Sequence, residues 1–98
     1  IPFETQIEQP ADGSTIPMGP GNFSVSVLIS PPLTDAEHLQ LEIDGAPYGP
    51  PQRQHQWSLS NIYRGEHQLR VHRLHSSGAQ MDVSDTSTVF VLRPSVAR

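Results

Sequence analysis

Apolar and polar residues alternate with a period of two along much of the chain. The clearest run begins at Phe23, where apolar residues and serines take turns for eight positions, interrupted only by Leu28. Because successive side chains of a β-strand point to opposite faces, this run predicts a half-buried strand. Its predicted inward residues are Phe23, Val25, Val27 and Ile29.

Three later runs repeat the alternation. The first stops at Asp44-Gly45, where the glycine supplies the positive φ that a tight turn needs. Each run predicts another strand with one face toward a common core. The predicted inward residues are Leu39, Leu41 and Ile43 in the first run, Trp57 and Leu59 in the second, and His67, Leu69 and Val71 in the third.

The last β-rich run, residues 86–92, has apolar residues on both of its faces. Alternation alone therefore leaves its orientation ambiguous. We expect Phe90 and Leu92 to face the core in preference to Val89 and Val91.

Proline and glycine separate these runs. Nine of the ten prolines fall before residue 52, and the tenth, Pro94, follows the last run. Because proline cannot donate to a ladder, we expect the stretch 52–93 to hold the central strand pairing. No segment shows a convincing helical stripe. The spacing of the turn signals indicates an all-β sandwich or small barrel of about seven strands, at 4–9, 15–18, 22–30, 38–44, 55–62, 66–75 and 86–93.

Composition argues against several classes of site and partner. The 98 residues correspond to one domain, and the absence of cysteine excludes a disulfide framework and thiolate metal sites. The net charge of −4 argues against nucleic acid and anionic membranes as partners, because both attract basic surfaces. Seven acids and no Lys or Arg lie in residues 1–50, whereas all six arginines lie in 51–98. We expect strands of the two halves to interleave, so that these charges mix.

The chain contains no targeting or membrane-spanning signal. It begins at Ile1 without an initiator methionine, and it has neither a signal peptide nor an apolar run long enough to span a bilayer. We therefore expect a single domain, 1–98, excised from a longer protein, monomeric in isolation and with no direct membrane insertion of its own.

Two segments resemble a known family. Residues 7–16, Ile-Glu-Gln-Pro-Ala-Asp-Gly-Ser-Thr-Ile, resemble the first strand and turn of bacterial envelope immunoglobulin-like (Ig-like) domains. Residues 57–71 resemble the block of the same domains in which a leucine and a turn precede arginine-glycine-x-histidine-x-leucine-x-valine, and Leu-Glu-Ile-Asp-Gly at 41–45 lies between the two segments. These domains belong to envelope proteins that carry an N-terminal domain of unknown function. The chain is more distantly similar to the C-terminal domain of bifunctional penicillin-binding proteins.

The resemblance implies an Ig-like β-sandwich in the periplasm or cell envelope. It brings no agreed activity and no catalytic residues, and a shared fold does not settle function. Three residues are expected to be structural: Trp57 as a core anchor, Gly65 in a turn, and His67 as a buried histidine at a corner between strands. We expect the His67 ring to donate one hydrogen bond and to accept another.

No motif indicates a metal site or a cofactor. The five histidines, at 38, 55, 67, 72 and 75, show poor ligand spacing, since residues 67 and 72, and residues 72 and 75, fall on opposite strand faces. Convergence of His55 and His72 across strands stays open. The acid pairs Asp82/Asp85 and Asp35/Glu37 match no calcium motif and are expected to be solvated turn residues.

No catalytic constellation appears either, so we expect no enzyme. The serines lie in neither G-x-S-x-G nor S-x-x-K, and the glycines form no phosphate loop. The best candidates for a contact surface are the turn tyrosines and their neighbouring arginines, although such tyrosines also pack across strand ends. These candidate residues are Tyr48, Arg53, Tyr63 and Arg64.

The sequence thus predicts a non-catalytic structural or protein-interaction module of a bacterial envelope protein. Its expected partners are neighbouring domains or other envelope proteins. The alternative, from a different class, is a module that binds peptidoglycan or another glycan.

Overall fold

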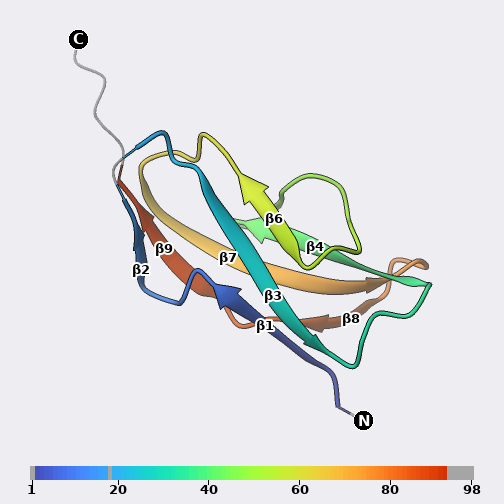
Figure 1. The fold of residues 1–98 in the computed structure, drawn as a ribbon. Coiled ribbons are helices and arrows are strands. Elements are labelled where there is room, and N and C mark those ends of the chain that lie inside the picture. The colour runs from blue at the N-terminus through green and yellow to red at the C-terminus, as the bar shows by residue number, and fades with distance from the viewer. Residues whose placement is uncertain (1, 18, 93–98) are drawn as a thin grey trace.

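The computed structural model describes residues 2–17 and 19–92, and these residues form nine β-strands and no helix (Figure 1). The strands are β1 (Glu4–Gln9), β2 (Ser14–Ile16), β3 (Phe23–Ser30), β4 (Glu37–Ile43), β5 (Ala46–Pro47), β6 (Gln56–Leu59), β7 (Gly65–His75), β8 (Gln80–Val83) and β9 (Ser87–Val91). The described residues contain no helix of the length and apolarity that a membrane span requires.

The strands form two sheets. The smaller sheet has the order β1-β3-β6, and the larger has the order β2-β9-β7-β4-β5, with β8 paired to β7 beside β9. All pairs are antiparallel except β2 with β9. The chain crosses from the smaller sheet to the larger one in the connection between β1 and β2, residues 10–13 (Figure 1). Since the inner faces of the two sheets share one core, the fold is a β-sandwich.

The alternating runs become strands as predicted. Each predicted segment overlaps one observed strand, and the predicted ends at Met18 and Arg93 lie outside the described residues. These segments are 4–9, 15–18, 22–30, 38–44, 55–62, 66–75 and 86–93. Strand β7 lies between β4 and β9, so the prediction of central pairing within 52–93 is confirmed for β7, whereas β6 is an edge of the smaller sheet. The buried core consists of Ile16, Val25, Val27, Leu39, Leu41, Trp57, Leu59, Leu69, Val71, Val89 and Val91.

Two short strands were not predicted. Strand β5 contains only two residues, one of them Pro47, and it pairs with the end of β4. Strand β8 has the sequence Gln-Met-Asp-Val, which is too short for its alternation to stand out, and its apolar residues Met81 and Val83 are both exposed. Both exist through hydrogen bonding to a long neighbouring strand rather than through a buried face of their own.

The prediction for the last strand is wrong. Val89 and Val91 are 0% and 1% exposed, whereas Phe90 and Leu92 are 40% and 43% exposed. The register with β7 decides the orientation, because it places Val89 directly opposite His67, on the inward face of that strand. Phe90 lies opposite Glu66 and faces outward.

Candidate functional site

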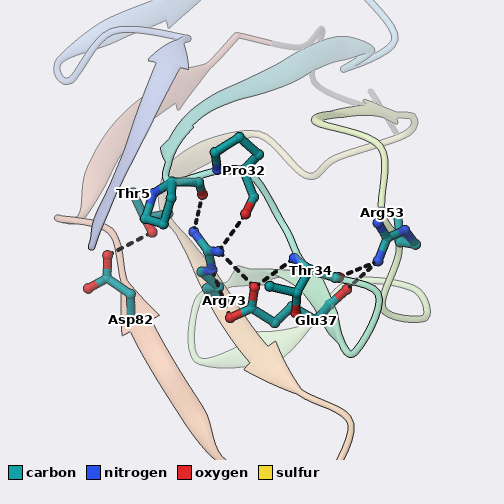
Figure 2. A network of polar contacts seen from close by, with 8 residues as sticks. Thr5, Pro32, Thr34, Glu37, Arg53, Arg73 and Asp82 are labelled. Carbon is teal, nitrogen blue, oxygen red and sulfur yellow. Dashed lines mark hydrogen bonds and ion pairs between the residues drawn. The ribbon is translucent and has the colours of Figure 1, made fainter. Parts of the chain in front are cut away.

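A buried ion pair between Arg73 and Glu37 dominates the polar structure at one end of the sandwich (Figure 2). The two residues are 0% and 3% exposed. Arg73 Nη2 lies 2.7 Å from Glu37 Oε1, and Arg73 Nε lies 3.2 Å from Glu37 Oε2, so the pair is bidentate. A fork-to-fork contact of this kind combines charge attraction with two directed hydrogen bonds.

The guanidinium also binds the chain that enters β4. Its Nη1 donates to the carbonyl of Pro31 at 2.5 Å, and its Nη2 donates to the carbonyl of Pro32 at 3.0 Å. The ring of Phe3 covers the cation, with its centroid 4.8 Å from Cζ. One buried side chain therefore joins the start of the chain, the β3–β4 connection and β7.

Glu37 and Thr34 bind each other reciprocally. The Thr34 amide donates to Glu37 Oε1 at 2.8 Å, and the Glu37 amide donates to the Thr34 carbonyl at 3.1 Å. Arg53 Nη1 then donates to the carbonyls of Thr34 and Glu37, at 2.7 and 3.0 Å (Figure 2). We refer to Thr34, Glu37, Arg53 and Arg73 as the polar clamp. Its charged groups are satisfied within the fold, as expected of a structural element.

Acid should weaken the polar clamp. The Arg73 hydrogen bond, followed by that of the Thr34 amide, lowers the pKa of Glu37 from 4.5 to about 2. Since the folded pKa is depressed, the resulting stability is present above the unfolded pKa and is lost as the pH falls from about 4.5 toward 2. We expect this loss to be about 1–3 kcal/mol, allowing for solvent screening. Urea unfolding of the wild type at pH values from 6 to 2 measures it.

The control for this prediction is Asp35→Asn, which removes an exposed carboxylate two residues away. Glu37→Gln should flatten the acid dependence of the unfolding free energy, whereas Asp35→Asn should leave it as in the wild type. Equal slopes for the wild type and Glu37→Gln would contradict the proposed role of the carboxylate.

Sequence reasoning missed this pair, although a signal was present. Glu37 has the inward parity of Leu39, and Arg73 has the inward parity of Val71. Two opposite charges at inward positions of two strands indicate a buried pair, provided that the strands are known to be neighbours. The expectation that Asp35 and Glu37 are both solvated turn residues is wrong for Glu37, whose carboxylate binds Arg73.

His67 closes a corner at the opposite end of β4. Its Nδ1 lies 2.6 Å from Asp44 Oδ2, and its Nε2 lies 2.7 Å from the Tyr63 carbonyl oxygen. Asp44 Oδ1 also accepts from the Gln68 amide at 2.8 Å. Gly65 has a φ of 123°, in a region that disfavours residues with a Cβ, and it lets the chain turn between Tyr63 and His67.

The predicted hydrogen-bond roles of His67 are wrong. Both of its partners are acceptors, so each ring nitrogen donates and the imidazolium is favoured. Burial alone lowers the pKa of His67, but the hydrogen bonds to Asp44 and to the Tyr63 carbonyl outweigh burial and leave the pKa above 6.5.

Asp44→Asn should therefore have a pH-dependent effect. Because the folded pKa of His67 is raised, the stability that it contributes is fully present below its unfolded pKa and is lost as the pH rises through the folded value. We expect the variant to lose about 1 kcal/mol at pH 5.5 and less at pH 9. Thermal unfolding at the two pH values measures this difference. A loss of stability that is the same at both would contradict a charged His67.

The structure separates the four predicted contact residues. The Arg53 guanidinium donates to the carbonyl of Glu37, the first residue of β4. Tyr63 and Arg64 lie at the His67 corner, beyond the last residue of β4. Six residue steps of a strand put about 20 Å between these places. Tyr48 is half-buried against the core, and its amide donates to the Leu41 carbonyl at 2.8 Å. Of the two tyrosines, Tyr63 is prominent on the surface, with 79% of it exposed.

Trp57 lies in the core, as its alternation with Leu59 predicts. Its indole Nε1 is buried and has no acceptor among the described residues. The ring therefore contributes apolar packing and offers no face to a ligand.

The histidines do not converge. His55 directly precedes β6 of the smaller sheet, and its carbonyl accepts a hydrogen bond from the Val27 amide. His72 lies on β7 of the larger sheet. His72 Nε2 lies 2.6 Å from Glu42 Oε1, and its Nδ1 lies 2.7 Å from Gln80 Oε1. Within residues 2–17 and 19–92, no three His, Cys, Asp or Glu side chains gather closely enough to hold a metal ion.

Comparison with known proteins supports the fold. No family model and no curated protein sequence matches the chain. It is similar to fibronectin(III)-like modules of CbhA from Clostridium thermocellum, with a TM-score of 0.69, 12% identity, and coverage of 92% of this chain and 98% of that one. These comparisons and the two sheets define the class, a fibronectin type III-like or Ig-like β-sandwich.

A second similar structure is SGBP-B of the mixed-linkage glucan utilization locus of Bacteroides ovatus, solved with a mixed-linkage heptasaccharide. The TM-score is 0.59 and the identity is 15%, over 94% of this chain and 25% of that chain. At these identities the likeness shows the fold alone. It gives no support to the more distant resemblance to penicillin-binding proteins.

Proposed function

We propose that this chain is a non-catalytic structural module that holds neighbouring domains at opposite ends of a β-sandwich. This proposal rests mainly on the positions of the two ends of the folded chain. Phe3 packs over Arg73 near the end of β7, whereas Val91, one residue before Leu92, pairs with Gly65 at the start of β7 (Figure 1). Eight residue steps of a strand separate these places by about 26 Å.

The polar groups inside the sandwich support this proposal. Arg73 and Glu37 bind each other, Ser84 Oγ accepts from the Val71 amide, and Ser87 Oγ donates to the Pro10 carbonyl. Each contact fastens one strand or connection to another. Buried polar groups that are satisfied in this way stabilise one shape of the sandwich. The similarity to fibronectin(III)-like modules agrees with such a role.

Tyr63 and Arg64 are our proposed contact for a following domain. They lie two and one residues before Gly65, at the end of the sandwich where Leu92 also lies. An exposed tyrosine supplies a large apolar area and a polar tip, which suits an interface between domains. We further place the module in the bacterial envelope, on the resemblance of residues 7–16 and 57–71 to envelope Ig-like domains.

Glycan binding is the competing function. A hollow on the smaller sheet is lined by polar side chains of the kind that bind sugar hydroxyl groups, and a structural neighbour was solved with an oligosaccharide. Yet no Phe, Tyr or Trp ring from the described residues lines this hollow, since Trp57 is buried and Tyr63 lies elsewhere. The lining residues are Glu8, Ser26, Val27, Arg53, Gln54, His55, Gln56 and Ser58.

An amide chemical-shift titration separates the two functions. The ligands are a mixed-linkage glucan heptasaccharide and soluble peptidoglycan fragments, each added to millimolar concentration. A structural module should show no saturable shift with either ligand. Saturable shifts clustered at residues 53–58, and abolished by Gln56→Ala but retained in Gln80→Ala, would replace the proposal with glycan binding.

A further inference from the structure

An open groove runs between the two sheets along the side where β1 faces β8 and the start of β9. On the smaller sheet it is bounded by consecutive residues from Phe3 to Glu8, and on the larger sheet by residues 82–83 and 85–87. A hydrogen bond of 2.8 Å from Thr5 Oγ1 to Asp82 Oδ2 links its two walls. The groove lining is Phe3, Glu4, Thr5, Gln6, Ile7, Glu8, Ala11, Asp12, Leu28, Asp82, Val83, Asp85, Thr86 and Ser87.

Both walls of the groove are sheet edges. Strand β1 is the outer strand of the smaller sheet, and β8 pairs with β7 alone among the described strands. An unpaired edge offers a row of backbone donors and acceptors to another extended chain. Of the two edges, β1 is the longer, with six residues against four.

The charges of the groove select its occupant. Five carboxylates line it, whereas no Lys, Arg or His from the described part of the chain does. No three of these acids gather closely enough to hold a metal ion. Carboxylates spread in this way match several separate positive charges on an extended partner. The five carboxylates belong to Glu4, Glu8, Asp12, Asp82 and Asp85.

The same charges argue against a second copy of this chain in the groove. Pairing two copies along β1 would bring Glu4 and Glu8 of one copy against the same residues of the other. Like charges that face each other across paired strands are destabilising. The partner is therefore a different segment, rich in Arg or Lys.

We propose that the groove docks an extended basic peptide segment of another protein, which adds a strand to the edge of β1. Main-chain hydrogen bonds to β1 supply the register, and alternate Arg or Lys side chains meet Glu4 and Glu8. This docking goes beyond the structural role proposed above, which does not require the groove to bind anything.

The test uses three synthetic octapeptides and an amide chemical-shift titration of this chain. The first peptide alternates Arg with Val and Thr. The second carries Glu in place of every Arg, and the third is the Arg peptide with every second backbone nitrogen methylated. Only the first should give saturable shifts at residues 4–8 and 82–86, since the second has the wrong charge and the third lacks donors along one edge.

Two double variants with the same change in net charge test whether the groove carboxylates bind the peptide. Glu4→Gln/Glu8→Gln should weaken binding of the first peptide roughly 3- to 10-fold, at the level of two exposed ion pairs. Asp35→Asn/Glu66→Gln changes the net charge equally but lies outside the groove, so binding should change less than about 2-fold.

Three results would overturn docking at β1: no saturable shift with the Arg peptide, equal binding of the methylated peptide, or equal weakening in both double variants. Each of them leaves the structural role standing, because that role is tested by the oligosaccharide titration and by the placement of the chain ends.

Discussion

Arg73→Ala is expected to lower the free energy of unfolding by about 3–5 kcal/mol, because it leaves the Glu37 carboxylate buried without its counter-charge. The variant also removes the hydrogen bonds to the carbonyls of Pro31 and Pro32. A domain of this size has a total stability of about 5–15 kcal/mol, so the variant loses a large part of it. Urea unfolding followed by tryptophan fluorescence measures the loss through Trp57, the single tryptophan.

The matched control is Arg70→Ala, three residues earlier on β7. Arg70 is exposed and donates to Thr86 Oγ1 at 3.0 Å, so its removal should cost less than about 1 kcal/mol. The double variant Glu37→Leu/Arg73→Met should recover most of the stability, since well-packed apolar residues replace buried ion pairs at little cost. Equal losses for Arg73→Ala and Arg70→Ala would show that the pair does not hold the fold together.

The second large effect is expected at β9. Val89→Asn should cost about 3–5 kcal/mol, because it places an amide without partners in the core beside Leu69 and Val71. Phe90→Asn introduces the same side chain one position later, on the solvent side, and should cost about 1 kcal/mol or less. Thermal unfolding of the two variants compares them directly. A larger loss for Phe90→Asn would mean that β9 presents its other face to the core.

Most of the fold could be predicted because its long strands bury one face and expose the other. The apolar inward residues of β3, β4, β6 and β7 follow from period-two alternation alone. The last strand could not be oriented in this way, since Val89 and Phe90 are both large and apolar and the pairing with β7 makes the choice. Register between strands is a tertiary property that a single segment does not encode.

The candidate site was less predictable. Tyr48, Arg53 and Tyr63 all lie in connections between strands, and which connections meet depends on how β4 and β5 pair. Sequence proximity suggested that Arg53 was a ligand contact, whereas its guanidinium binds the carbonyls of Thr34 and Glu37. Loop side chains are placed by long-range contacts, so their roles emerge only with the topology.

The structure explains why acids dominate the first half of the chain and arginines lie only in the second. As predicted, the halves interleave, and acids of the first half pair with groups of the second at three places across β4 and β7. These pairs are Glu37 with Arg73, Glu42 with His72 and Asp44 with His67. The acids of β1 take no part in these pairs and instead line the groove that we assign to a basic partner.

The most direct test of the structural role is the distance between the two ends of the folded chain. Because the sequence contains no cysteine, Glu4→Cys/Leu92→Cys gives two unique spin-label sites. Pulsed electron paramagnetic resonance should yield one narrow distance distribution centred at about 25–35 Å, as expected for sites at opposite ends of β7. A distribution centred below about 15 Å would place both ends on the same side of the sandwich and contradict a module that holds its neighbours apart.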